Sequence, residues 1–268
     1  MEDSPNNMSF LGHLEILRWH LVRSAAAVFI FAIVLFIFQG IVFDHFLLAH
    51  LQSDFSTYRF FCNVFGFVGI DSGFCDISFP QKLQSLGLTQ QLMSAIWTSL
   101  ILGIILAFPY LLWEIWRFVA PGLHPRERKK SRGFIFIASL LFFIGVAFSY
   151  YVIAPMSVSF FYGYQISDKI TNNFTLDSYI SLITNTLLGV SVMFELPVLI
   201  YFLSKLGLIS PSFLRKYRKH ALVLVLIVSA IITPPDVASQ VIVSIPILIL
   251  YELSIYVSSF VAKKQSKN

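Results

Sequence analysis

The sequence predicts an all-α membrane protein with six transmembrane helices. Hydrophobic residues make up 57% of the 268 positions and charged residues only 12%, against about 25% charged residues in an average soluble domain. The mean hydropathy is +0.77, and apolar stretches of roughly 20 residues, the length that crosses a bilayer as a helix, recur along the chain. Basic residues gather in short loops between these stretches, which is typical of a multispanning protein.

The expected spans form a single polytopic domain over residues 1–268. They cover approximately residues 22–43, 91–112, 133–153, 179–204, 220–232 and 237–260. Apolar residues at helical spacing between Phe10 and Leu21 predict a short helix on the cytoplasmic surface that turns into the first span. The fifth and sixth spans are expected to be short, the fifth covering only about 20 Å of a hydrocarbon core about 30 Å thick. The spans pack either as a closed bundle or as an open concave cup.

The distribution of Lys and Arg predicts the orientation of the chain. Of 19 such residues, only Arg59, Lys82 and Lys169 lie in the segments expected outside, and the other 16 flank the opposite ends of the spans. The loop between the second and third spans is the most basic. It carries Arg117, Arg126, Arg128, Lys129, Lys130 and Arg132. Because basic loops stay in the cytoplasm, both termini are expected there, and the net charge of +5 is not a nucleic-acid signal.

The sequence argues against several classes of function. It has no glycine-rich phosphate loop and no His/Cys ligand cluster, so no nucleotide, other cofactor or metal is expected. No paired nucleophile and base lies within the spans, which argues against an intramembrane enzyme. A proton-coupled secondary transporter that uses Glu195 stays open as an alternative, although no strong internal repeat supports it.

Four motifs, in order along nearly the whole chain, resemble one family. They are Ser9–Arg18 (SFLGHLEILR), Trp116–Leu123 (WRFVAPGL) followed by Glu127-Arg128, Phe194–Pro197 (FELP), and Thr233–Asp236 (TPPD) followed by Ser239-Gln240. Each motif alone is weak, but the combination is similar to TatC, the multispanning receptor subunit of the twin-arginine (Sec-independent) protein translocase. The outer stretch Arg59–Ile77 departs from the family pattern, because it is longer and rich in Phe and Gly.

The resemblance implies a role in protein export. A TatC-like chain would bind the twin-arginine signal peptide of folded cargo proteins. It would recruit small single-span subunits of the TatA and TatB type, and the assembly would move cargo with the proton-motive force. The expected place is the bacterial cytoplasmic (inner) membrane, where the chain would form a homo-oligomer within a larger complex without cofactor, metal or nucleic acid.

The residues proposed to bind the signal peptide are Glu15, Leu17, Phe118 and Glu127. A carboxylate accepts a forked, charge-assisted pair of hydrogen bonds from arginine, a geometry that lysine cannot copy. The alternative is that Glu15 pairs with Arg18 and Glu127 with Lys130 as exposed helix-surface pairs of at most about 1 kcal/mol. Leu17 and Phe118 would form the floor of the site or, alternatively, pack at the membrane boundary. Glu114 is interpreted as an ordinary partner of Arg117 without a function.

Three further polar residues are candidates for an intramembrane or partner site. Glu195 is an ionisable group inside the fourth span, and such groups usually face water or a polar partner. Thr233 and Gln240, at the outer ends of the last two spans, offer hydrogen bonds to a partner helix. The alternatives are a protonated or snorkelling carboxyl at Glu195 and simple capping of a tight turn by Thr233 and Gln240.

The two cysteines, Cys62 and Cys75, both fall in the first outer segment. In an oxidising compartment they would form a disulfide that closes this loop. Two unrelated cysteines are the alternative, and the sequence does not decide between them.

Overall fold

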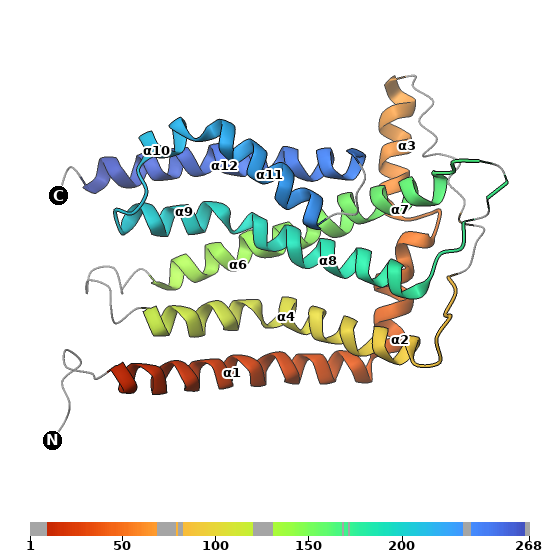
Figure 1. Cartoon of the computed structure of the whole chain (residues 1–268), viewed down its shortest axis with the longest axis horizontal. Coiled ribbons are helices and arrows are strands. Elements are labelled where there is room, and N and C mark those ends of the chain that lie inside the picture. The colour runs from red at the N-terminus through yellow and green to blue at the C-terminus, as the bar shows by residue number, and fades with distance from the viewer. Residues whose placement is uncertain are drawn as a thin grey trace. The chain divides into compact units, whose positions relative to one another are not determined.

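A computed structural model of the chain describes residues 10–68, 79, 83–119, 131–167, 169–170, 172–232 and 237–265. These residues are almost entirely helical and contain no regular strand, only an isolated bridge between Gln84 and Thr175. The all-α prediction is therefore confirmed. Figure 1 colours the helices from red near the N-terminus to blue near the C-terminus. The chain divides into two compact units.

Five helical stretches among the described residues are long and apolar enough to cross a membrane. They cover Leu14–Ile37, Gln90–Val119, Gly133–Gly163, Leu176–Lys205 and Gln240–Lys263. Each coincides with an expected span. The count of six spans, the single-domain organisation, the concave or closed packing and the cytoplasmic termini stay predictions.

The first unit combines Met1–Val42 with Leu92–Leu140. It contains α1 (Phe10–Ile37), α2 (Gln39–Ile41), α4 (Gln90–Val119) and the beginning of α6 (Ser131–Phe148). Helix α1 runs without a break over 28 residues. The prediction of a turn between a surface helix and the first span is therefore wrong. No Pro or Gly interrupts the sequence from His13 to Phe38, so the hydrogen-bonded helix continues into the span.

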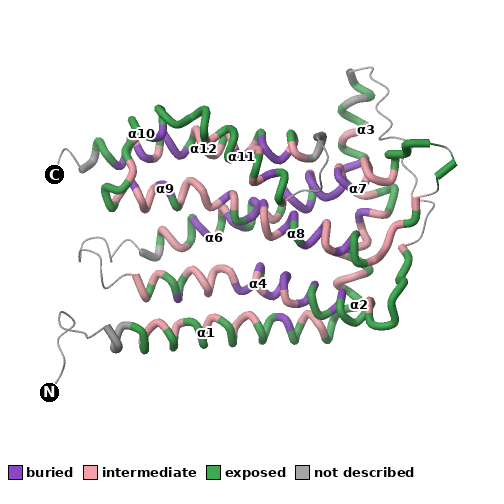
Figure 2. Tube along the Cα trace, in the orientation of Figure 1, coloured by how far each residue is buried: buried purple, intermediate pink, exposed green. Residues whose placement is uncertain are grey.

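A small-residue contact holds α1 against α4. Gly103 is buried on α4, and a Cβ built on it would lie 3.0 Å from the backbone nitrogen of Ala32 and from the carbonyl oxygen of Val28. Only a residue without a side chain permits this approach, as at many helix interfaces in membranes. The rest of α1 is mainly intermediate or exposed (Figure 2), which is expected of an apolar helix that faces lipid.

The second unit combines Phe43–Gln91 with Leu141–Asn268. Its first part is an irregular helical segment of η1 (Val42–Leu47), η2 (Leu48–Leu51) and α3 (Ser56–Val68). The sequence analysis did not predict α3. The other outer part follows α6 as η4 (Ser149–Ile153) and α7 (Ala154–Gly163).

Buried rings and hydroxyl groups tie this outer segment to η4 and α7. The His50 ring is fully buried, with Nε2 2.9 Å from the Tyr150 carbonyl oxygen and Nδ1 3.2 Å from that of Leu47. The Tyr58 hydroxyl donates to the carbonyl oxygens of His50 and Pro155 at 2.9 and 3.2 Å. Burial lowers the pKa of His50, although both carbonyl contacts act in the opposite direction. These bonds satisfy carbonyl groups that the irregular helices leave free.

The fourth span is interrupted at Glu195, the ionisable residue that the sequence places inside it. Helix α8 (Leu176–Phe194) ends at Glu195, and α9 (Leu196–Lys205) begins directly after it, with Pro197 in its first turn. Proline lacks the N–H that a continuous helix would need and fits at a helix start. Helix α9 ends at Lys205. Two residues further on, Gly207 has a φ of 75°, and Gly207 N and Leu208 N donate back to Ser204 O and Leu203 O.

Helices α10 (Pro211–Lys216), α11 (Arg218–Ile232) and α12 (Val237–Gln265) complete the second unit. Helix α11 has only 15 residues, which agrees with the short length expected there, while its role as a fifth span stays a prediction. Helix α12 has 29 residues, so the prediction of a short sixth span is wrong: Pro246 lies inside this helix without ending it. An apolar core joins α11 and α12 to α8 and η4. Its buried members are Ile153, Val190, Phe194, Val225, Val243 and Ile247.

Candidate functional site

The first unit contains a buried carboxylate, Glu114, near the end of α4. Its side chain is 1% exposed. His20 Nδ1 of α1 donates to Glu114 Oε2, the Tyr110 hydroxyl donates to Oε1 at 2.9 Å, and Arg117 Nη1 lies 3.7 Å from Oε1. A buried carboxylate is costly unless it is paired and hydrogen-bonded, and here both oxygens are engaged. The cluster is the second attachment of α1 to α4.

A pocket of about 340 Å³ lies beside this cluster. Its lining comes from α1 and from the end of α4, and consists of Ile16, Trp19, His20, Arg23 and Arg117. Arg117 stacks its guanidinium over the Trp113 ring at 4.9 Å from the centroid. The pocket therefore combines two guanidinium groups with aromatic and apolar walls.

The signal-peptide candidates of this unit lie at the same ends of α1 and α4. Glu15 pairs with Arg18 at 2.6 Å, with side chains that are 53% and 63% exposed, which is the exposed helix-surface pair of the alternative interpretation. The Phe118 ring contacts the His20 ring edge-on at 6.1 Å, and both Leu17 and Phe118 are half-buried. Glu127 lies outside the described residues.

In the second unit, Glu195 stands at the junction of α8 and α9. The side chain is half-buried, and within the described part of the chain its Oε1 is buried without a hydrogen-bond partner. A buried carboxyl oxygen without a hydrogen-bond partner inside a span is typical of a group that meets a polar group of another molecule, rather than of a group with a structural role.

Gln240 already has a partner within the chain. Its Nε2 donates to the carbonyl oxygen of Leu226 at 3.0 Å and so links α12 to α11. This contact is the intramolecular alternative to a partner site, although one amide hydrogen bond leaves the carbonyl end of the side chain for a second. Thr233 lies outside the described residues.

Comparison with known proteins decides the family. Residues 12–246 match the family model described as Sec-independent protein translocase protein (TatC). The chain belongs to the TatC family. It is 41% identical to the TatC protein of Blattabacterium sp. subsp. Periplaneta americana (strain BPLAN), covering 99% of this chain and all of that protein. It is 36% identical to that of Carboxydothermus hydrogenoformans, with coverage of 99% and 98%.

Solved structures agree with the sequence matches. The crystal structure of the twin arginine translocase receptor TatC in DDM is 30% identical and has a TM-score of 0.74, covering 92% of this chain and 99% of that one. Membership of TatC makes the chain a component of a protein translocase and a multi-pass membrane protein. TatC is not known as an enzyme family, which agrees with the sequence.

The sequence interpretation of this TatC chain missed the cluster around Glu114. The Arg117 contact was expected, but His20 and Tyr110 were not. One signal was available, since Tyr110 and Glu114 stand four residues apart on one helix face. The His20 contact spans 94 positions, and no local pattern could indicate it.

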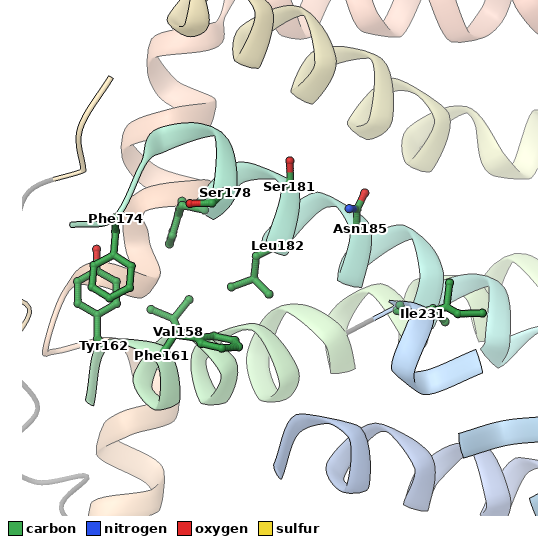
Figure 3. A pocket seen from close by; sticks show the side chains of 11 residues that line it. Val158, Phe161, Tyr162, Phe174, Ser178, Ser181, Leu182, Asn185 and Ile231 are labelled. Carbon is green, nitrogen blue, oxygen red and sulfur yellow. The ribbon is translucent and has the colours of Figure 1, made fainter. Parts of the chain in front are cut away.

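The second unit of the TatC chain also holds an apolar cavity of about 490 Å³ between α7, α8 and the end of α11. Val158 and Phe161 on α7 lie opposite Leu182 on α8 (Figure 3). In the same unit Cys62 is disulfide-bonded. Cys75, the other cysteine of the sequence, lies outside the described residues, so the pairing stays a prediction.

Proposed function

We propose that this TatC chain binds the twin-arginine signal peptide of folded cargo proteins and recruits single-span TatA- and TatB-type subunits for export driven by the proton-motive force. The proposed place is the bacterial cytoplasmic (inner) membrane, and the proposed state is a homo-oligomer within a larger complex. The observation that carries the proposal is the likeness, over 92% of the chain, to a structure described as a twin arginine translocase receptor.

The geometry of Glu15 supports its role in binding the peptide. Its partner Arg18 is held in an exposed pair, and such pairs contribute at most about 1 kcal/mol. An arginine of the signal peptide can replace Arg18 at little cost and gain the forked geometry. Glu127 is the second proposed acceptor, and Leu17 and Phe118 the proposed apolar floor.

For the second unit, we propose that Glu195 meets a polar group of a partner helix or of cargo, and that Thr233 and Gln240 contact the single-span subunits. The buried, unpaired Oε1 of Glu195 supports the first part. The solute-transporter alternative finds no support in the family match.

Site-specific crosslinking to a twin-arginine peptide tests the proposal, with a twin-lysine peptide as the specificity control. Glu127→Gln should reduce the arginine-peptide crosslink to the level of the lysine peptide, because it removes the charge from the fork. Glu252→Gln is the matched control, since it removes the same charge from the exposed Arg218 pair of the second unit. Wild-type crosslinking in Glu127→Gln would refute the assignment of Glu127, and equal crosslinking of both peptides would refute the proposed function.

A further inference from the structure

The pocket between α1 and the end of α4 contains an arginine, Arg23, for which the described residues supply no counter-ion. Arg23 makes no ion pair or hydrogen bond within the described part of the chain, although it lies inside the apolar stretch Leu14–Ile37. An ionised side chain in such a stretch is costly unless it pairs. The second arginine of the pocket, Arg117, is 46% exposed and reaches Glu114 only at 3.7 Å.

The negative charge nearby does not neutralise the pocket. Glu114 is buried behind it, and its oxygens accept from His20 and Tyr110. The described lining of the pocket thus carries two guanidinium groups and no carboxylate, and because Glu114 contacts only Arg117 of the two, the pocket keeps a net positive charge. This charge selects an anion and opposes a peptide that carries two arginines.

The surroundings of the pocket select a lipid over a free anion. Trp19 and Trp113 are 51% and 43% exposed, and such rings favour the headgroup level of a membrane. Leu21 and Val22, which adjoin the pocket residues on α1, are 60% and 51% exposed. A diacyl lipid would cover these apolar side chains while its phosphate meets the arginines, whereas a free phosphate would leave them bare.

We propose that this pocket binds the phosphate headgroup of an anionic phospholipid, with Arg23 and Arg117 as its ligands. A volume of about 340 Å³ is within the range of small-molecule sites. Basic pockets between transmembrane helices on the cytoplasmic side bind anionic headgroups, and the distribution of basic residues predicts that side here. The proposal does not depend on the signal-peptide function.

The test uses the purified full-length chain in a non-ionic detergent and measures thermal stabilisation on titration with phosphatidylglycerol, phosphatidylcholine or glycerol phosphate. Phosphatidylglycerol should stabilise in a saturable way, because it binds the folded chain. Arg23→Gln and Arg117→Gln should each weaken its apparent affinity about fivefold, and together about 25-fold. Arg218→Gln is the matched control, since Arg218 is an exposed arginine of the second unit that does not line the pocket, and the lipid affinity of this variant should equal that of the wild type.

Four results would overturn the proposal. Equal stabilisation by phosphatidylcholine would remove the selectivity for an anion, and equal stabilisation by glycerol phosphate would make the ligand a free phosphate. Unchanged affinity in the doubly substituted protein would exclude the arginines. Photo-labelling of the unaltered chain covers the case in which the variants do not fold: photoactivatable phosphatidylglycerol should label the segments around Trp19 and Trp113. Labelling of these segments by a twin-arginine peptide and not by the lipid would assign the pocket to the peptide.

Discussion

The contact between Gly103 and α1 gives the sharpest stability prediction. A Cβ at position 103 would lie 3.0 Å from Ala32 N and Val28 O and 3.2 Å from Ala32 Cα, where ordinary contact begins at 3.4 Å. All three atoms are backbone, so no side chain can rotate away. In Gly103→Ala, α1 must therefore move away from α4 by about 0.4 Å or the packing must be strained, at a cost of about 1–3 kcal/mol.

The same substitution at Gly133 is the matched control. Gly133 lies on α6 in the same unit, and a Cβ there meets nothing within 4 Å. Both alanines gain up to about 1 kcal/mol of helix propensity, so this gain cancels in the comparison. Gly103→Ala should then be less stable than Gly133→Ala by about 1–3 kcal/mol of unfolding free energy.

Unfolding by SDS in mixed micelles, followed by tryptophan fluorescence, measures this difference. All four tryptophans lie on α1 or α4, so the signal reports the first unit. Gly103→Val should lower stability further. Its effect and that of Glu114→Gln should be less than additive if both detach the same helix. Equal stability of Gly103→Ala and Gly133→Ala would refute the argument that this close approach holds α1.

Three further predictions concern the second unit. Because burial lowers the pKa of His50, the unfolded chain binds a proton more readily than the folded chain, and the free energy of unfolding should fall as the pH drops below about 6.5. His50→Gln should flatten this pH dependence in thermal unfolding at several pH values, and an unchanged slope would contradict the prediction. If Cys62 pairs with Cys75, thiol labelling in intact cells should appear only after reduction, and equal labelling before reduction rules the bridge out. The Thr233→Val, Gln240→Leu protein should lose export of folded cargo and crosslinking to the single-span partner while peptide binding survives. Normal export and crosslinking would move the partner site elsewhere, with Glu195 as the next residue to test.

The helices were predictable from sequence because each depends on local composition. A stretch such as Gln90–Val119 is predominantly apolar, and the backbone of such a segment can satisfy its hydrogen bonds within a bilayer only as a helix. The interruption at Glu195 and Pro197 and the short α11 were also local. Two predictions about helices were wrong. The turn expected at the start of α1 has no Pro or Gly to cause it, and Pro246 is compatible with a continued α12.

The site was less predictable, because its contacts join distant positions. Glu15 and Arg18 are three residues apart, and their pair could be anticipated. His20 meets Glu114 across 94 positions, and Tyr179 donates to the carbonyl oxygen of Leu47 across 132. Such contacts depend on which helices pack together, and the periodicity of one chain does not encode that pairing.

The charge balance of the first unit bears on the proposed binding of arginine amid basic residues. In the described part, the three guanidinium groups near the site have different partners. Arg18 pairs with exposed Glu15, and Arg117 lies between Glu114 and the Trp113 ring. For Arg23 the proposed partner is the lipid phosphate. Repulsion falls as each charge is neutralised. If Arg23 and Arg117 are neutralised by lipid, the remaining exchangeable pair is Glu15 with Arg18, where an incoming arginine replaces a like residue. Anionic lipid should therefore strengthen binding of a twin-arginine peptide, and this effect should disappear in the Arg23→Gln, Arg117→Gln protein.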